Sequence, residues 1–326
     1  MYFIGKSTIL LYFLILFTPV LLAQEEPIIR QNLVAGSDIT VKKTLPDINF
    51  AAVGDFGCGD EANRTVNNII TKNPRLVLAL GDLSYSGETG CWFKLVSPFE
   101  RNNIALRIVV GSHDIGKNSD KYDQYLNHFK MDKPYYSFDY QNLHFLGMTT
   151  GKESLIPYDN ASDQYQFVKK DLEKTHGNSN IDWIIVFGFT PLYSTFTVHS
   201  GDGDLRDLYH PLFNKYGIDL VIQAHNHNYQ RTYPLLYNEH IPSKPIITDK
   251  NKEKYSNPKG EIFLTVGTAG ADLHNLTGQK PFIVKQFDDS HGFLNIDITN
   301  NGKKLISTFY ENRELSVKDR FTVIKN

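Results

Sequence analysis

Residues 224–231 read AHNHNYQR and follow directly on an apolar run, IDLVI at 218–222. The apolar run predicts a buried strand. Two histidines separated by one residue, just past the end of a strand, can face the same crevice from a short loop. Because neutral imidazole is a common metal ligand, His225 and His227 indicate two metals, or one metal and one substrate group. Ordinary loop polarity is the alternative interpretation of this pair when it is considered alone.

Four further apolar runs precede this stretch, and the residue directly after each run is a glycine, which begins a loop. The runs are INFAAV at 48–53, LVLAL at 76–80, ALRIVV at 105–110 and DWIIVF at 182–187. Helix-like segments lie between the runs, at 60–70, 122–129, 164–173 and 205–216. Continuous apolar strands that alternate with helices predict an α/β fold, in which parallel strands are buried on both faces.

The C-terminal part of the sequence has a different pattern. Residues 261–266, 292–298 and 304–310 are strand-like, with little helix between them. We expect these strands to form a second, mixed or antiparallel sheet that packs on the first. In open α/β sheets, ligands bind beyond the carboxyl ends of the strands, so the loops after the five upstream strands are the expected site.

Composition limits the function classes. The chain has 326 residues, of which 41% are hydrophobic and 21% are charged, so it can bury a large core as one large domain or two small ones. The formal net charge is −2 and no long basic run occurs. A nucleic-acid partner is therefore not expected.

The N-terminal 23 residues stand apart from the rest of the sequence. Lys6 is followed by an apolar segment and then by Ala23, a small residue at a suitable cleavage point, as in a secretory signal. An uncleaved membrane anchor is the alternative, because the apolar segment is near the length that spans a bilayer. We expect a signal peptide or N-terminal anchor at 1–23, a linker at 24–46 and one domain at 47–326. Either alternative predicts a secreted or extracytoplasmic protein, and a membrane is a partner only if the segment is uncleaved.

Further features bear on export. Three sequons, at Asn63, Asn160 and Asn275, are compatible with it. The two cysteines, Cys58 and Cys91, allow a single disulfide in an oxidising compartment. Two free thiols near a metal site are the alternative. The spacing of the cysteines is not that of a zinc knuckle, so we interpret them as structural.

The loops after the strands carry side chains of the kind that hold transition metals. These side chains are Asp55, Asp82 with Tyr85, His113 with Asp114, and His225 with His227. A mixed set of carboxylates and imidazoles suits iron, zinc or manganese, whereas calcium prefers oxygen ligands alone. A single aspartate after a strand is usually a helix N-cap, but a series of such loops argues against that interpretation.

In order along the chain, five segments resemble the metal motifs of the purple acid phosphatases, which are calcineurin-like metallophosphoesterases. The segments are Gly54-Asp55, Gly81 to Tyr85, Gly111 to Asp114, Phe189 to Tyr193, and His225 to His227. The resemblance implies a four-layer αββα sandwich with two mixed sheets, in the short form of the family. It also implies a hydrolase in which a metal-bound hydroxide attacks a phosphomonoester.

The resemblance also implies a set of metal ligands. Fe(III) would be bound by Asp55, Tyr85 and His227. Asp82 would bridge to a second metal, Zn, Mn or Fe(II), that His225 also binds. Two further ligands of the second metal, an amide and a histidine in the family, are replaced here by Ser112 and Phe189. A serine hydroxyl is a weaker ligand than an amide and a phenyl ring offers none, so the second metal site is altered.

Catalytic roles follow from the same resemblance. His113 would donate a hydrogen bond or proton to the leaving oxygen, and Asp114 would orient it or raise its pKa. His199 lies where the family often places a histidine that contacts the substrate. The expected partner is a phosphorylated small molecule or protein, with specificity set by loops near 152–163 and 195–204.

Two functions of different classes remain open. The first is an exported phosphoric-ester hydrolase with an altered second metal site. The second is a degenerate member that binds a metal or phosphate without efficient turnover; a phosphodiesterase is a further alternative to the monoesterase. A replacement ligand from His199 or His274 would favour the enzyme. Apolar atoms of Phe189 in the second site would favour the binding protein.

Overall fold

The computed structural model describes residues 45–115, 120–151, 157 and 159–326. The predicted signal or anchor at 1–23 and residues 24–44 of the predicted linker lie outside the described residues. Residues Thr44–Asn326 form one compact unit. In this described part of the chain, we find no helix with the length and apolarity needed to cross a membrane.

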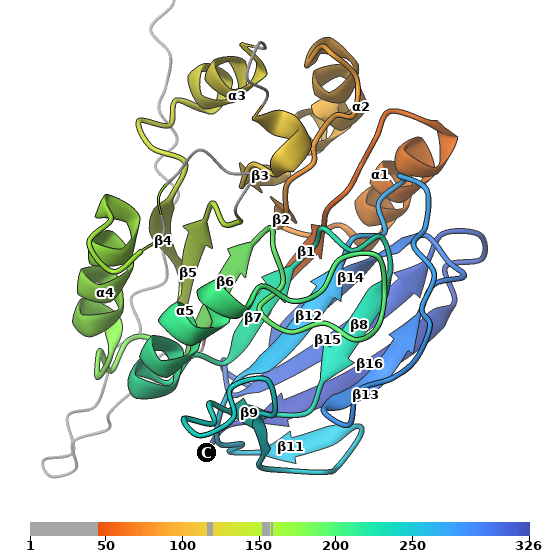
Figure 1. Ribbon diagram of the computed structural model, residues 1–326. Coiled ribbons are helices and arrows are strands. Elements are labelled where there is room, and N and C mark those ends of the chain that lie inside the picture. The colour runs from red at the N-terminus through yellow and green to blue at the C-terminus, as the bar shows by residue number, and fades with distance from the viewer. Residues whose placement is uncertain (1–44, 116–119, 152–156, 158) are drawn as a thin grey trace, which may run out of the picture. The chain divides into compact units, whose positions relative to one another are not determined.

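Two seven-stranded sheets occupy the centre of this unit (Figure 1). The first sheet has the order β11-β16-β15-β14-β1-β2-β3, with β1 (Ile48–Val53), β2 (Leu76–Ala79), β3 (Ala105–Ile108), β11 (Lys254–Ser256), β14 (Gly292–Thr299), β15 (Lys304–Glu311) and β16 (Val317–Ile324). The second sheet has the order β13-β8-β12-β7-β6-β5-β4, with β4 (Tyr136–Tyr140), β5 (Leu143–Met148), β6 (Trp183–Gly188), β7 (Leu220–Gln223), β8 (Tyr229–Thr232), β12 (Ile262–Val266) and β13 (Ile283–Phe287). A small ribbon pairs β9 (Leu235–Leu236) with β10 (Ile246–Ile247).

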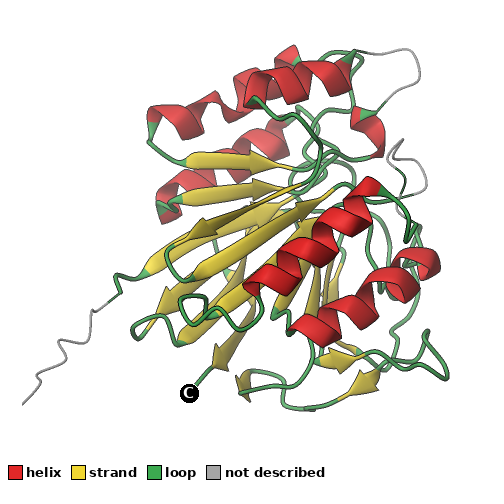
Figure 2. Ribbon diagram, turned by 90° about the vertical axis from the view of Figure 1, so that its left-hand side faces the viewer, coloured by secondary structure: helices red, strands yellow, loops and turns green. Residues whose placement is uncertain are grey.

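Helices cover the outer faces of both sheets (Figure 2). On the first sheet, α1 (Asp60–Lys72) contacts β14 and α2 (Gly90–Arg101) contacts β3. On the second sheet, α4 (Asp163–Thr175) contacts β5, and α5 (Gly203–Tyr216) lies beside α4. A short 3₁₀ turn, η1 (Ser112–Asp114), and α3 (Lys121–Phe129) follow β3. The predicted four-layer αββα sandwich with two mixed sheets is confirmed.

The main hydrophobic core lies between the two sheets. Phe50 of the first sheet and Phe145 of the second are both fully buried, and their rings meet edge to face with centroids 5.2 Å apart. A second core fills the space between the second sheet and its two helices, with Leu146, Val168 and Leu205 among its members. Burial of such side chains, worth about 1.5–3 kcal/mol each, fixes the sheets against each other and therefore fixes the strand ends.

The predicted division of strands between the sheets is wrong. The five upstream strands do not form one parallel sheet, because β1, β2 and β3 belong to the first sheet whereas β6 and β7 belong to the second. The C-terminal strands are divided too: β12 pairs in parallel with β7, while β14 pairs antiparallel with β1. The apolar pattern of a strand reports that both faces are buried but does not identify its neighbour, which tertiary packing decides.

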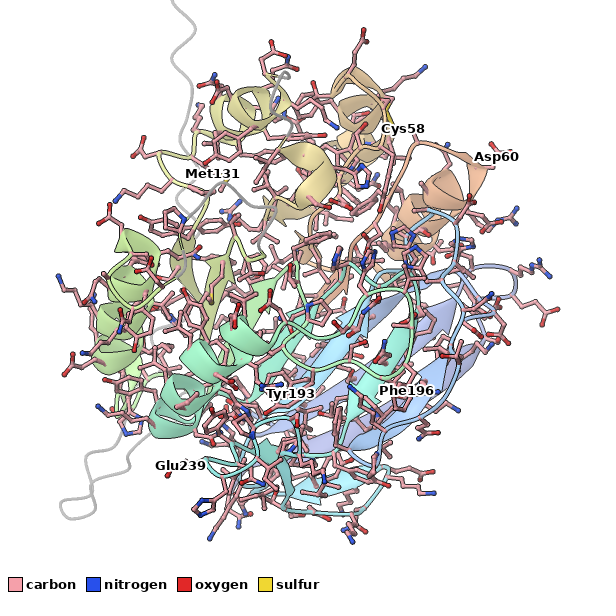
Figure 3. All side chains as sticks on the ribbon, viewed as in Figure 1. Cys58, Asp60, Met131, Tyr193, Phe196 and Glu239 are labelled. Carbon is pink, nitrogen blue, oxygen red and sulfur yellow. A yellow bond between two sulfur atoms is a disulfide. The ribbon has the colours of Figure 1, made fainter. Side chains whose placement is uncertain are left out.

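A disulfide joins Cys58 to Cys91, with the Cα atoms 6.0 Å apart. Cys58 lies on the loop that leads into α1, where Figure 3 labels it, and Cys91 is the second residue of α2. The bond therefore connects the ends of two neighbouring helices that pack on the first sheet. The expected structural role of the cysteines is borne out by this placement.

Candidate metal centre

The strands that carry the candidate ligands end at the same edge of the sandwich. The amide of Gly54, after β1, donates to the carbonyl oxygen of Val266 at the end of β12, at 2.9 Å. This bond connects the two sheets where they deliver their loops. In the second sheet, the amide of Ala224, after β7, donates to the carbonyl oxygen of Phe189, after β6, at 2.9 Å. Side chains from four loops can therefore converge.

Four of the predicted ligands converge in this way. One ligand atom from each of Asp55, Asp82 and His227 lies within 4.8 Å of the others, and all three residues are buried. The hydroxyl of Tyr85 lies 3.0 Å from Oδ1 of Asp55 and 2.8 Å from Nε2 of His227. We call these four residues the metal cluster. His225 lies next to it, and its backbone amide donates to Oδ2 of Asp55 at 2.9 Å.

The backbone is strained at the cluster. Asp55, Asp82 and His225 have positive φ angles of 58°, 46° and 68°. This left-handed conformation costs a residue other than glycine about 1–2 kcal/mol. Such strain persists where the surrounding structure enforces it, and it is frequent at functional sites. Here it occurs in the loops that follow β1, β2 and β7, at two residues of the cluster and at His225 next to it.

The electrostatics of the cluster indicate that it binds a cation. Burial and the charge of Asp55 raise the pKa of Asp82 well above its ordinary value. Burial and the same two carboxylates raise the pKa of Tyr85. Burial lowers the pKa of His227, but the hydrogen bond and charge of Asp55 outweigh it, so the net pKa is raised. Each shift reports negative charge crowded into a buried space, which a multivalent cation would relieve. The residues present therefore fit a metal with hard, anionic ligands.

The position expected for the second metal has a different character. The ring of Phe189 is buried and lies 4.7 Å from the ring of His225, centroid to centroid. It packs closely on the two glycine loops, since a Cβ atom on Gly81 or Gly111 would lie 2.7 or 2.8 Å from its ring carbons. Apolar atoms therefore stand beside His225.

Ser112, at the other position where the family resemblance implies a ligand, lies close to the cluster. Its hydroxyl lies 3.5 Å from Oδ1 of Asp82, which also accepts the backbone amide of His113 at 2.8 Å. Gly111 permits this arrangement, because a Cβ atom there would overlap Oδ1 of Asp82. The loop after β3 thus reaches Asp82 mainly through its backbone.

Two histidine pairs flank the cluster. The rings of His199 and His225 are stacked, with centroids 4.0 Å apart, and those of His227 and His274 are stacked at 3.8 Å. Burial and the neighbouring His227 lower the pKa of His274 to about 4. Both side chains considered as replacement ligands therefore lie beside a predicted metal ligand.

The two residues predicted to act in proton transfer occupy different environments. The ring of His113 lies against the ring of Tyr85, with centroids 4.5 Å apart, so it is beside the cluster. Asp114 is fully buried, and its carboxylate accepts the amides of Gly111 at 2.8 Å and Leu83 at 2.9 Å. Burial raises the pKa of Asp114 to about 6. These contacts show that Asp114 connects two site loops, while its predicted action on His113 stays a prediction.

Sequence reasoning missed Lys121. This lysine is 3% exposed, and its Nζ donates to the carbonyl oxygens of Ser84 at 2.6 Å, Ser86 at 2.9 Å and His113 at 2.8 Å. It therefore holds the Tyr85 loop against the His113 loop. A lysine at the start of a helix is usually exposed, so nothing in the sequence pattern indicated this role.

Sequence reasoning also missed three buried carboxamides that alternate with the site histidines. Asn226 accepts the amide of His199 at 3.1 Å, Asn228 donates to the hydroxyl of Thr197 at 3.0 Å, and Gln230 accepts the amide of Thr195 at 2.8 Å. They hold residues 194–199, which we call the mouth loop, in place beside the cluster. The regular spacing of the three carboxamides, at every second residue, could have indicated this role, because polar side chains in a buried stretch need hydrogen-bond partners.

The comparison with protein families agrees with this geometry. Residues 48–229 match the family model described as calcineurin-like phosphoesterase. The chain belongs to this family. Among the calcineurin-like phosphoesterases, its relatives are purple acid phosphatases. Purple acid phosphatases are metal-dependent, and the metal cluster is the candidate site in this chain.

One curated relative and two solved structures illustrate the similarity. Purple acid phosphatase 21 of Arabidopsis thaliana is 28% identical over 247 residues, which are 70% of this chain and 52% of the relative. The solved structure of purple acid phosphatase PPD1 from yellow lupin (Lupinus luteus) seeds has a TM-score of 0.73 and 19% identity, covering 86% of this chain and 54% of that chain. The solved structure of GAP50, the anchor in the inner membrane complex of Plasmodium, has a TM-score of 0.64 and 16% identity. The match covers 86% of this chain and 89% of that chain. The two structural likenesses show the fold, and the chain spans about half the length of the curated relatives it matches.

Proposed function

We propose that this protein is an exported metal-dependent phosphoric-ester hydrolase that acts on phosphomonoesters. The observation that carries the proposal is the convergence of Asp55, Asp82, Tyr85 and His227 in a chain of the calcineurin-like phosphoesterase family. The three exposed sequons and the disulfide are compatible with export. Its substrate is a phosphorylated small molecule or protein.

Asp55, Tyr85 and His227 would hold Fe(III), with Asp82 beside them. A phenolate and carboxylates are hard, anionic ligands, and their crowding in the buried cluster favours a highly charged cation. When bound, such an ion supplies a Lewis acid that lowers the pKa of water and neutralises charge on phosphoryl oxygens.

The remaining roles belong to side chains of this protein. His113, whose ring lies against that of Tyr85, would donate a proton to the leaving oxygen. His199, stacked on His225, would contact a phosphoryl oxygen. Asp114 and Lys121 hold the loop of Tyr85 against the loop of His113. The proton donor and the metal ligand therefore keep their positions relative to each other.

The second metal site is altered in this proposal. Phe189 contributes no donor atom, and its ring stands against His225, a predicted ligand of that metal. We therefore assign one tightly held metal to the cluster, with Zn, Mn or Fe(II) excluded from a stable second position by the ring.

A member that binds a metal or phosphate without efficient turnover is the second candidate function. The packing of Phe189 against His225 favours it, because the loss of a second cation removes one clamp on the phosphoryl group. The stacking of His199 on His225 favours the enzyme, since it supplies a further polar group at the same place.

Hydrolysis of a chromogenic phosphomonoester distinguishes the two functions. The purified protein, loaded with iron and with or without zinc or manganese, is assayed between about pH 4 and pH 8, beside an Asp82→Ala control. Activity that needs the metal and is lost in Asp82→Ala supports the hydrolase. A folded, metal-loaded protein with no activity above this control supports the binding function.

A further inference from the structure

A cavity of about 360 Å³ opens beside the metal cluster. Ser112, Phe189 and His225 all line it, so it lies on the side of the site where the second metal was expected. The volume is near the lower end of the range of small-molecule sites, about 300–1,000 Å³. The two positions at which this chain departs from the family pattern therefore help to form a cavity.

The cavity adjoins the metal cluster. The hydroxyl of Ser112 lies 3.5 Å from Oδ1 of Asp82, and the amide of His225 donates to Oδ2 of Asp55 at 2.9 Å. A phosphoryl group at the cluster would therefore direct its ester alcohol into this space. Lining residues such as Ser200 and Asp202 then contact the alcohol part of the substrate, while His199 contacts its phosphoryl part.

Polar side chains dominate the lining. Four residues with hydroxyl groups line it together with Asp202: Ser112, Thr150, Thr190 and Ser200. Among the lining side chains of the described residues, only those of Phe189 and Val198 are apolar. An aromatic alcohol would leave these polar groups without partners as it displaced water, whereas a polyhydroxylated alcohol would pair with them.

The walls of the cavity are fixed by hydrogen bonds. Asp202 caps α5, and both capping bonds, from the amides of Asp204 at 3.0 Å and Leu205 at 3.1 Å, fall on Oδ1. Its own amide donates to the carbonyl oxygen of Pro191 at 2.8 Å. This arrangement holds Asp202 in place and directs the cap to one carboxylate oxygen. The other oxygen, Oδ2, can accept hydrogen bonds from a ligand.

We propose that the cavity binds the alcohol part of a compact, polyhydroxylated phosphomonoester, a sugar phosphate, with Asp202 accepting hydrogen bonds from its hydroxyls. The inference rests on the proposed function, because the cluster must hold the phosphoryl group. It narrows the substrate class of that function. Asp202 is then a specificity-determining residue and takes no part in bond cleavage.

Binding of phosphonates tests the inference without turnover, because their C–P bond is not hydrolysed. The affinities of the phosphonate analogue of glucose 6-phosphate and of phenylphosphonate are measured by calorimetry on the iron-loaded protein. We expect the sugar analogue to bind at least about tenfold more tightly. Asp202→Asn retains an N-cap residue of similar quality and should reduce this preference about fivefold.

Two more variants complete the experiment. Asp207→Asn, an equal change of charge at an exposed position of α5 that pairs with Arg206, should leave the preference unchanged. Ser200→Leu, which fills the cavity, should weaken the sugar analogue and spare inorganic phosphate. Equal affinities for the two phosphonates, or a preference that survives both Asp202→Asn and Ser200→Leu, would overturn the inference.

The two proposals fail in different ways. Tight, Asp202-dependent binding of the sugar analogue, in a protein that hydrolyses no phosphomonoester, supports the cavity and refutes the hydrolase. Hydrolysis of glucose 6-phosphate and phenyl phosphate with equal kcat/KM, in both the wild type and Asp202→Asn, supports the hydrolase and refutes the cavity.

Discussion

Phe189 is the residue that most changes the chemistry expected of this site. Its phenyl ring lies directly after β6 and next to His225, at a position where the family resemblance implies an imidazole. The buried ring removes a donor and adds apolar surface where a cation would need ligands. At the scale of one residue, our proposal therefore keeps the first metal site and alters the second.

Restoring the ligands should restore the second metal. In the double variant Ser112→Asn/Phe189→His, we expect bound metal to rise from one ion per chain to two, because an amide and an imidazole replace groups that bind weakly or not at all. Metal content after loading with iron and zinc, measured by mass spectrometry, checks this. Phe196→His, an exposed position on the mouth loop labelled in Figure 3, is the matched control. Two ions per chain in the unaltered protein would contradict the prediction.

Gly267 is a second position where one residue decides the site. A Cβ atom there would overlap the carbonyl oxygen of Asn226 and Oδ2 of Asp55. Gly267→Ala should therefore displace a metal ligand and weaken iron binding by at least about tenfold, the usual cost of disturbing the support of a metal ligand. Gly90→Ala, where a Cβ atom would meet nothing within 4 Å, should bind iron normally. Equal iron affinity in both variants, measured by competition with a chelator, would refute this account.

At the scale of elements, a buried histidine away from the site connects two strands and a helix. His144 in β5 lies 2.6 Å from Asp139 of β4 through Nδ1, and 2.8 Å from Asp171 of α4 through Nε2. Burial lowers the pKa of His144, but the hydrogen bonds and charges of Asp171 and Asp139 outweigh it, and the net pKa is raised. The edge strand and the helix are therefore held best when the imidazole is protonated.

This contact should make stability depend on pH. The folded protein holds the His144 proton more tightly than the unfolded chain, whose pKa is about 6.5. The stabilisation is complete below that value and is lost as the pH rises through the higher folded pKa. We expect the free energy of unfolding in urea to fall with increasing pH above about 6.5, and to fall less in His144→Gln. His240→Gln, at an exposed position, should behave as the wild type; an unchanged slope in His144→Gln would count against the prediction.

At the scale of the whole molecule, the metal cluster connects the two sheets. Asp55 follows β1 of the first sheet, and His227 lies between β7 and β8 of the second. A cation bound by both residues would therefore oppose separation of the sandwich. The backbone bond from Gly54 to Val266 crosses between the sheets at the same edge.

Metal binding should accordingly raise the thermal stability of the whole domain. At a metal concentration about 100 times Kd, binding to the folded state contributes about 2.7 kcal/mol. For a domain of this size that corresponds to an increase in Tm of about 5 °C or more. Calorimetric scans with and without iron check this, with Asp55→Asn as the variant that should not respond. An iron-induced increase that persists in Asp55→Asn would show that the stabilising site lies elsewhere.

The sequence identified the side chains that converge better than it identified the architecture around them. The order of the strand-end motifs predicted that Asp55, Asp82, Tyr85 and His227 share a site, and they do. It did not indicate the role of Lys121, because the sequence does not show whether a lysine is buried or exposed. Its burial depends on three carbonyl oxygens that only the folded loops bring together.

The sequence by itself determined the α/β class, the burial of the central strands and the candidate ligands at their ends, because hydrophobic periodicity and loop composition are local properties. Only the tertiary structure decided which sheet each strand joins, since a strand buried on both faces is compatible with several neighbours. The tertiary structure also decided the character of the second site. Ser112 and Phe189 are far apart in the chain, and only folding places them beside His225 at one cavity.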